Sequence, residues 1–418
     1  MKRNRVLICV IAMMLMMTTL VACGGGTETE TTTEPTSTTE ATAGAATGTT
    51  EQPSASAPAG ATGKPTTQTT QVPAATQTPG GTPLQNARAK TQVGAWYSLW
   101  YNGTGADSFW ETVTNDYGDR IPILYKPLLP DGTFGRYNSN DSAVMQFHLQ
   151  EITKVGIDFL IFDQTNDIDA RDASGKTWIN NNSIKMAKAI TAWNKVEGNR
   201  PIRYCSAVGT FASVDKETGS AYPTGAKKLN VIEEEAYKLY DRYIKKEWGS
   251  EKNHVYVDGK PLLVVFTVTQ AEWEAYAKTH DTPYADKFTL RFAVGHAYEP
   301  GLWGWVIPKA QVTQDVVTIN PGWYKNPHPL EKVYRNRGET YKTQWETILS
   351  SNITPNFIVI NSINEYAEQT AIWPADTSDF PANHPVERWL NKAGQEDPYL
   401  YWNMTKLYIQ KYRNGDKQ

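Results

Sequence analysis

Two glutamates three residues apart, Glu365 and Glu368, are the residues of this sequence best suited to acid–base chemistry. They follow the short apolar run 357–360, whose β-branched residues predict a buried strand rather than a helix. Polar and aromatic residues come next, among them Asn364, Tyr366 and Trp373. If the chain turns after the strand, both carboxyls can face one cavity, and a carboxyl pair that gives and takes a proton suits cleavage of a glycosidic bond. The same spacing also occurs in solvated loops and at helix starts, so a structural role stays open.

The strand before the glutamates is one of eight apolar runs that predict strands. The others are 93–97, 156–163, 202–208, 262–266, 289–294, 303–306 and 316–320. Helices are predicted over 142–155, 180–193, 229–248, 271–278, 339–349 and 400–412. Because strands alternate with helices, the pattern predicts parallel βαβ units and an α/β fold, a (β/α)8 TIM barrel. The run 303–306 is the weakest strand, and 255–257 is expected to pair with 262–266 through a turn at Asp258-Gly259.

Polar and aromatic residues recur directly after these predicted strands. Active-site groups of such barrels come from the carboxyl ends of the strands, which makes the following residues candidates for contact with a substrate. They are Tyr97, Trp100, Asp163, His296, Glu299, Trp323 and Tyr324. The chain also holds 14 Trp and 22 Tyr, whose flat faces suit stacking on sugar rings but can equally fill a large core.

The amino terminus has the pattern of an export signal. Lys2, Arg3 and Arg5 precede the apolar run 6–20, which is too short to span a bilayer comfortably. Small residues then lead into Cys23, and this arrangement resembles a bacterial lipobox. That resemblance implies a lipoprotein signal peptide at 1–22, lipidation of Cys23, and a protein anchored to the extracellular face of the bacterial cell membrane.

Residues 23–91 are built mostly from Thr, Ala, Gly, Pro, Ser, Gln and Glu, so a packed core cannot form there. We expect a disordered linker, with O-glycosylation left open, that spans on the order of 45 Å as a flexible coil. Residues 92–418 form one block without a second linker, and single α/β barrels reach this size. The sequence therefore predicts one catalytic domain on a tether.

Composition argues against several other classes of function. A net charge of −3 gives no electrostatic reason to expect nucleic acid as a partner. Of the three cysteines, Cys9 leaves with the signal and Cys23 carries lipid, so Cys205 has no disulfide partner and is expected in the core. The six histidines show no metal-ligand spacing, and no Gly-rich phosphate loop is present. We expect no metal, no cofactor and a monomer.

Several segments together resemble the glycoside hydrolase family 71/99-like barrels, a group that includes endo-α-mannosidases and α-1,3-glucanases. The shared segments are Trp96-Tyr97, 137–141 before His148, 156–159, 319–323, 337–341 before Trp345, and 364–368. The resemblance implies that Glu368 is the proton donor and Glu365 the base, acting on water or on the neighbouring sugar 2-hydroxyl. It also implies that Asn364 hydrogen-bonds a sugar hydroxyl and that Asp163, Tyr97 and Trp323 line the subsite. As proton donor, Glu368 would need a raised pKa.

The sequence departs from the family pattern at three positions close to the glutamate pair. Tyr366 stands where the family commonly has Trp, Gln369 where it has Gly, and Trp373 where an acidic residue is common. The carboxylate pair is retained, whereas the substrate stays open.

The resulting hypothesis is a surface-anchored glycoside hydrolase that cleaves α-linked glycans of mannan or glucan type. The alternative from another class is a non-catalytic glycan-binding surface lipoprotein on a barrel scaffold, because a fold does not guarantee activity. A further alternative is an enzyme that processes the cell's own polysaccharide. Linkage, endo or exo action and stereochemical outcome stay open.

Overall fold

The computed structural model describes residues 82–101, 110, 124–165, 168–169, 178–210, 226–293, 299–325, 332–381 and 386–417. All of these belong to the compact unit Gln77–Gln418. The predicted signal peptide, Cys23, most of the predicted linker and His296 lie outside the described residues, so the expectations about them stay predictions.

Seven parallel strands form the sheet that these residues describe, in the order β7, β6, β4, β3, β1, β9 and β8. Their bounds are β1 Gln92–Tyr97, β3 Phe159–Asp163, β4 Arg203–Gly209, β6 Lys260–Phe266, β7 Thr289–Ala293, β8 Val316–Ile319 and β9 Phe357–Ile360. The short β5 (Tyr256–Val257) runs antiparallel to β6, as predicted, through a turn in which Asp258 and Gly259 have positive φ. A separate two-stranded ladder joins β2 (Lys126–Pro127) to β10 (Ala375–Asp376).

Side chains that alternate along the strands belong to two apolar clusters, one on each face of a curled sheet. One cluster takes residues from all seven parallel strands, such as Trp96 of β1, Phe159 of β3 and Phe357 of β9. The Phe159 and Phe357 rings lie 6.0 Å apart although β1 separates their strands. The alternate residues, such as Tyr97, belong to the other cluster, which includes residues of the helices. We call the two sides the inner face and the helix-facing layer.

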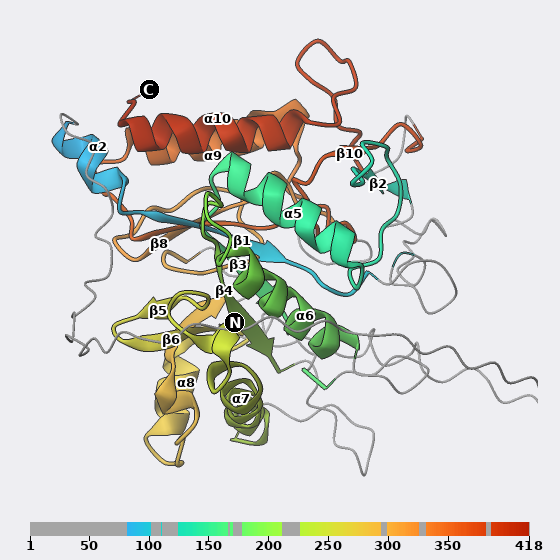
Figure 1. Ribbon diagram of the computed structural model, residues 1–418. Coiled ribbons are helices and arrows are strands. Elements are labelled where there is room, and N and C mark those ends of the chain that lie inside the picture. The colour runs from blue at the N-terminus through green and yellow to red at the C-terminus, as the bar shows by residue number, and fades with distance from the viewer. Residues whose placement is uncertain are drawn as a thin grey trace, which may run out of the picture. The chain divides into compact units, whose positions relative to one another are not determined.

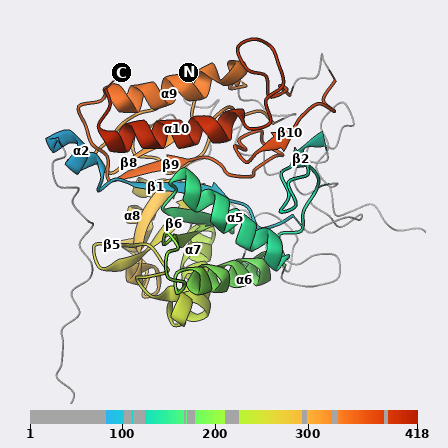
Figure 2. The same cartoon turned by 45° about the horizontal axis from the view of Figure 1, so that its top comes forward.

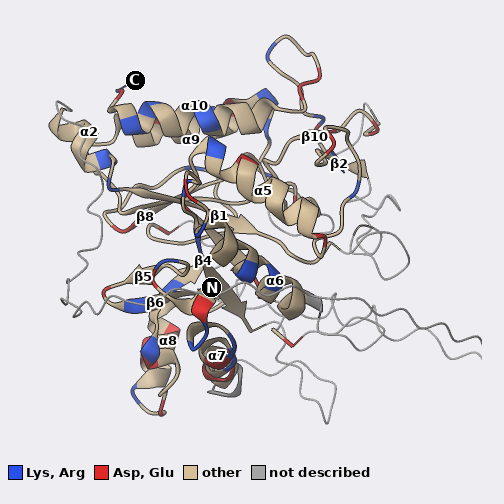
Figure 3. Cartoon of the chain, viewed as in Figure 1, with Lys and Arg blue, Asp and Glu red and all other residues tan. Residues whose placement is uncertain are grey.

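Helices cover the outside of the sheet: α5 Ser142–Val155, α6 Trp178–Trp193, α7 Ala226–Leu239, α8 Gln270–Ala277, α9 Glu339–Ser350 and α10 Leu400–Asn414. Figures 1 and 2 show α10 beside α9 and α5 beside α6. Figure 3 shows residues of both charge signs along helices such as α7. None of the helices among the described residues combines the length and apolarity needed to cross a bilayer.

Local sequence explains where several helices begin and end. Asp141 caps α5 by accepting from the amide of Ala143, and Gly156 ends that helix with a φ of 100°. Thr269 and Glu272 form a capping box at the start of α8. The helix predicted over 229–248 is shorter than expected, because α7 gives way to a π-helical turn at Tyr240–Ile244.

A small helix, α2 (Pro83–Arg88), falls within the range 23–91 that composition assigns to the linker. Thr82 caps it and Pro83 occupies its first turn. The buried guanidinium of Arg88 donates to the carbonyl oxygens of Leu349 and Asp416, both at 2.7 Å. These contacts attach the segment to the compact unit, which therefore includes residues before 92.

The strand predicted over 303–306 is absent, and this prediction was wrong. The segment lies between the edge strands β7 and β8: the Trp303 amide donates to Phe292 of β7, and Thr318 of β8 donates to the Leu302 carbonyl. Trp305 and Val306, although adjacent in sequence, both pack in the inner cluster. A β-strand would send consecutive side chains to opposite faces, so this segment joins the two edges without strand geometry.

Candidate active site

The segment 361–373 that follows β9 is held at the carboxyl end of β1. Its Ile363 amide donates to the Trp96 carbonyl at 2.8 Å. Within the segment, the amides of Ser362 and Thr370 donate to Thr370 and Glu365, and the Glu365 amide donates to the Ser362 hydroxyl. The chain therefore doubles back after the strand, which presents Glu365 and Glu368 from one turn.

Glu365 is a buried carboxyl, with only 3% of the residue exposed. Its Oε1 accepts from the backbone amides of Ala367 at 2.9 Å and Glu368 at 3.3 Å. Burial raises the pKa of Glu365 to about 8, the negative charges of Glu368 and Asp163 add to the rise, and the more distant ammonium of Lys325 opposes it. At pH 7, Glu365 therefore carries a proton.

Glu368 meets a different environment, on the inner side of the same turn. Its Oε1 lies 2.7 Å from the Lys325 ammonium, and its Oε2 accepts from the indole N–H groups of Trp323, at 3.0 Å, and Trp305. Burial alone would raise the pKa of Glu368, but Lys325 and the two indoles outweigh it and lower the pKa to about 2. Glu368 is therefore ionised at pH 7, which contradicts the expectation that it holds a proton there.

Asp163 is a third carboxyl near the pair. It is the last residue of β3 and shares the parity of Phe159 and Ile161, so it faces the inner side. Burial raises its pKa to about 6, although Thr165 donates two hydrogen bonds to it, and the charge of Glu368 adds to the rise. Besides burial, the negative charge of Glu368 thus raises the pKa values of both Asp163 and Glu365 across the carboxyl ends of β3 and β9.

Aromatic rings on the inner face hold the Trp305 indole against Glu368. Trp305 packs edge-on against Trp96, with centroids 5.0 Å apart, and against Phe266 at 5.7 Å. Trp96 is fixed in turn by its indole N–H, which donates to the Trp303 carbonyl at 2.7 Å. Gly304 permits this approach, because a Cβ there would lie 3.2 Å from the Trp96 ring. On the side opposite Lys325, Glu368 therefore contacts aromatic rings that neighbouring side chains hold in place.

Two predicted site residues from the end of β1 lie in the helix-facing layer. Tyr97 is on the opposite parity to Trp96, and its hydroxyl pairs with Nδ1 of His148 on α5 at 2.7 Å. Burial lowers the pKa of His148 to about 3, so the imidazole is neutral at pH 7 and serves as a structural partner of Tyr97. Trp100 is 4% exposed and packs in the same layer. The predicted contact of Tyr97 and Trp100 with a substrate does not fit these positions.

Three predicted site residues of the segment 361–373 are also turned away from the carboxyl pair. The amide of Asn364 is used internally: Oδ1 accepts from the Ser98 amide, and Nδ2 donates to the Ser98 carbonyl and the Tyr137 hydroxyl, each at 2.8 Å. Tyr366 is fully buried and stacks on Trp110. Trp373 is fully buried, and its indole N–H donates to the Leu128 carbonyl at 3.1 Å. These side chains hold the turn in place and are not available to a sugar.

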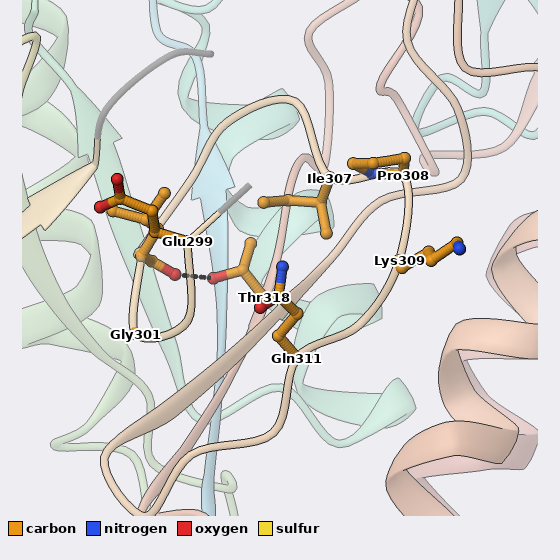
Figure 4. A pocket seen from close by; sticks show the side chains of 8 residues that line it. Glu299, Gly301, Ile307, Pro308, Lys309, Gln311 and Thr318 are labelled. Carbon is orange, nitrogen blue, oxygen red and sulfur yellow. Dashed lines mark hydrogen bonds between the residues drawn. The ribbon is translucent and has the colours of Figure 1, made fainter. Parts of the chain in front are cut away.

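The predicted residues after β7 and β8 behave differently from one another. Trp323 joins the site directly through Glu368, whereas Tyr324 is tied to it by its backbone, whose amide donates to the Glu368 carbonyl at 3.1 Å. Glu299 is exposed and lines a separate, shallow surface hollow with Lys309, Gln311 and Thr318. Figure 4 shows Glu299 and Lys309 at opposite ends of this hollow. It contains none of the three carboxyls, so it is not the candidate active site.

Sequence reasoning missed two residues that matter most to Glu368. Lys325 stands two positions after Trp323, in the polar exit of β8, and its position after a strand was an available signal. The apolar run 303–306 predicts a strand that includes Trp305, so the contact of its indole with Glu368 was not expected. Among the described residues, no group of three or more His, Cys, Asp and Glu could hold a metal ion.

Gln369 explains one departure from the family pattern. It has a φ of 64°, in the left-handed region that favours glycine, the residue the family commonly has there. Its side chain donates to the Tyr366 carbonyl at 2.9 Å and accepts from the Tyr125 hydroxyl. The buried guanidinium of Arg335 donates to the Gln369 carbonyl at 2.7 Å. These bonds compensate for the strained backbone, so the turn keeps a glycine-like geometry without glycine.

A curled sheet of parallel strands with helices outside it and carboxyls at its carboxyl end is a TIM-barrel-like arrangement. No family profile matches the chain. No curated protein sequence matches it either.

The fold is similar to that of the family 99 endo-α-mannosidase from Bacteroides thetaiotaomicron, in complex with bis-tris propane. The TM-score is 0.51 at 15% identity, and the match covers 78% of this chain and 98% of that chain. A second structure of that enzyme gives a TM-score of 0.50 at 16% identity, with the same coverage. At these identities the likeness shows the fold alone: the fold is family 99-like, and the family 71 part of the resemblance stays a prediction.

Proposed function

We propose that this protein is a glycoside hydrolase that cleaves α-linked glycans of mannan or glucan type with Glu365 and Glu368. What supports this most is that the two carboxyls lie on one turn at the carboxyl end of the sheet and differ in ionisation. The pKa of Glu365 is raised to about 8, whereas that of Glu368 is lowered to about 2. Pairs of carboxyls driven apart in pKa are typical of acid–base sites.

The ionisation favours roles opposite to those that the family resemblance implies. Glu365 holds the proton, so it donates to the glycosidic oxygen as the bond from that oxygen to the anomeric carbon breaks. Glu368 is the carboxylate, so it accepts the proton of the water, or of the sugar 2-hydroxyl, that attacks the anomeric carbon. Asp163 adds negative charge near the positive charge that develops on the sugar. Because catalysis requires the protonated Glu365, turnover should fall as the pH rises through about 8.

The remaining parts of the hypothesis concern the place of action. The lipobox-like Cys23 and the linker would tether the catalytic domain to the extracellular face of the cell membrane, with a polysaccharide or oligosaccharide as its substrate and no nucleic acid partner. Metabolic labelling with a palmitate analogue tests the anchor: label on the wild type and none on Cys23→Ala is the expected result. Whether the glycan is foreign or the cell's own is a separate question for the substrate panel.

A substrate panel tests the activity itself. The full chain is incubated with α-mannans, α-glucans and host-type glycans, and released reducing ends are measured. The matched control is the double variant Glu365→Gln/Glu368→Gln, which keeps the side-chain shapes and removes both acid–base groups. We expect release by the wild type and none by the control. Equal release by both proteins would contradict the assignment.

One observation favours a second candidate, a non-catalytic glycan-binding protein. Both oxygens of Glu368 are occupied, by Lys325 on one side and by two indoles on the other. A carboxylate engaged in this way can serve as a fixed charge in a binding site. Glycan binding by calorimetry, without release of any sugar across the panel, would support this candidate.

A further inference from the structure

Lys325 is the cation that contacts the candidate acid–base pair. It follows β8, two residues beyond Trp323, and its Nζ lies 2.7 Å from Oε1 of Glu368. The side chains of Lys325 and Glu368 are 29% and 19% exposed, so the ion pair is partly desolvated but reached by water. An opposite charge at this distance favours the ionised form of a carboxyl strongly in such surroundings.

The geometry fixes this contact from both sides. The indole N–H groups of Trp305 and Trp323 hold the other oxygen of Glu368, so the carboxyl group cannot rotate away without losing two further hydrogen bonds. The Tyr324 amide, next to Lys325, donates to the Glu368 carbonyl at 3.1 Å. Backbone and side chain of Glu368 are therefore both bound to the segment that follows β8.

Few other charges act on the pair among the described residues. Asp163 at the end of β3 is near both glutamates, and the hydroxyls of Tyr101 and Tyr137 lie near Glu365. None of these groups is a cation. Among the described residues, Lys325 is thus the cation that distinguishes Glu368, which it contacts directly, from Glu365, whose carboxyl accepts from the backbone amides of Ala367 and Glu368.

We propose that Lys325 is a positioning residue that holds Glu368 as the carboxylate and thereby leaves Glu365 to carry the proton of the pair. The inference deepens the proposed function, since it states what assigns the acid and base roles in this chain. With Lys325 removed, burial at Glu368 is opposed by the two indole N–H groups without the ammonium charge, and the negative charge that raises the proton affinity of Glu365 is weakened. The proton then moves toward Glu368.

Carboxyl titration by NMR tests this without any substrate. The full chain is labelled with glutamate carrying ¹³C at the side-chain carboxyl, and the signals of Glu365 and Glu368 are identified from their loss in the Glu→Gln variants. In the wild type we expect Glu368 to titrate far below Glu365. In Lys325→Met the midpoint of Glu368 should rise by more than about one pH unit, the usual effect of losing a close opposite charge.

Two further variants separate charge from packing. Lys325→Arg keeps the charge and should leave Glu368 titrating in the acidic range. Lys332→Met is the matched control, because Lys332 also follows β8 but approaches Glu387, at 3.8 Å, rather than the pair. A Glu368 midpoint that does not move in Lys325→Met, or that moves equally in Lys332→Met, overturns the inference. So does a wild type in which Glu368 titrates above Glu365, which is decisive even if Lys325→Met does not fold.

The pH dependence of turnover gives the second readout. Lys325→Met should shift the acidic limb of the profile upward by more than about one pH unit, whereas Lys325→Arg should restore the wild-type limb. If no glycan of the panel is cleaved, the proposed hydrolase activity fails while the NMR titration still decides the role of Lys325. An unchanged acidic limb in an active Lys325→Met variant would count against that role.

Discussion

The inner face of the sheet and the helix-facing layer receive side chains from the same short segments and use them differently. Trp96 and Tyr97 are neighbours in β1. Trp96 packs against Trp305 beside the carboxyl pair, whereas the Tyr97 hydroxyl forms a hydrogen bond with His148 of α5. The segment after β9 divides in the same way. Its Glu368 faces Lys325 and two indoles, whereas its Trp373 is buried against Leu128 and the helices.

The difference shows which polar groups solvent can reach. In the helix-facing layer, Asn364, Tyr97 and Trp373 each bond to a neighbouring backbone or side chain, and burial leaves no room for a ligand. On the inner face, Glu368 and Lys325 keep partial exposure. Variants on the inner face should therefore lose activity, whereas variants in the helix-facing layer should lose stability.

Replacing the inner carboxylate should remove activity. Glu368→Gln keeps the shape of the side chain but removes the base and the partner of Lys325, so we expect turnover of the active glycan to fall by about 10²–10⁴-fold. The measurement is initial rate at saturating substrate, with the fold checked by circular dichroism. Glu396→Gln is the control, because it removes an exposed carboxylate that pairs with Arg388 at 3.0 Å. Wild-type turnover in Glu368→Gln would refute its role.

Truncating the helix-facing layer should cost stability instead. Trp373→Ala leaves a cavity among His148, Phe147 and Trp402 and removes a buried hydrogen bond, so the free energy of unfolding should fall by about 3–5 kcal/mol. Urea unfolding followed by fluorescence measures it. A loss below about 1 kcal/mol would show that Trp373 is not a core residue of this layer.

Glu365 is buried on the same turn as Glu368, and its proton should be visible as a pH dependence of stability. Its pKa is about 8 when folded against an ordinary value of 4.5, so the folded state binds a proton that the unfolded state has lost. Stability therefore falls as the pH rises from about 4.5 through 8, by up to a few kcal/mol. Glu365→Gln should flatten this slope in urea titrations at a series of pH values. An unchanged slope in the variant would mean that the raised pKa belongs to another group.

The smallest effect is expected for the Tyr97 hydroxyl. Tyr97→Phe removes its hydrogen bond to His148 and should cost about 1–2 kcal/mol of unfolding free energy. Turnover and glycan affinity should stay at the wild-type level, because the ring lies away from the carboxyl pair. A large change in the Michaelis constant with unchanged stability would indicate that Tyr97 contacts the substrate.

Much of the architecture could be predicted from local patterns. The runs at 93–97, 289–294 and 357–360 became β1, β7 and β9, and the helices from 142, 271 and 400 became α5, α8 and α10, because apolar spacing and capping residues act over a few positions. The run at 303–306 failed, because two tryptophans and a valine are apolar enough for a strand but are held by Trp96, Phe292 and Thr318, which are remote in sequence.

The site could be predicted only in part. The pairing of Glu365 with Glu368 and the inward position of Asp163 follow from local sequence and strand parity. Of the other aromatic and amide residues proposed to touch substrate, Trp323 alone, among those the structure describes, bonds directly to a carboxyl of the candidate pair, because nearness to a strand end does not say which face a side chain takes.

Local patterns in the sequence were enough to predict most of the strands and helices, and to predict that two carboxyls follow the last strand of the parallel sheet. The tertiary structure decided which of them keeps the proton. Ionisation depends on burial and on charges a few ångströms away. The groups that matter most are Trp323 and Lys325 after β8 and Trp305 in the segment between β7 and β8, about 40 to 60 residues earlier in the chain. The pairing of β8 with β9 places the first two beside Glu368.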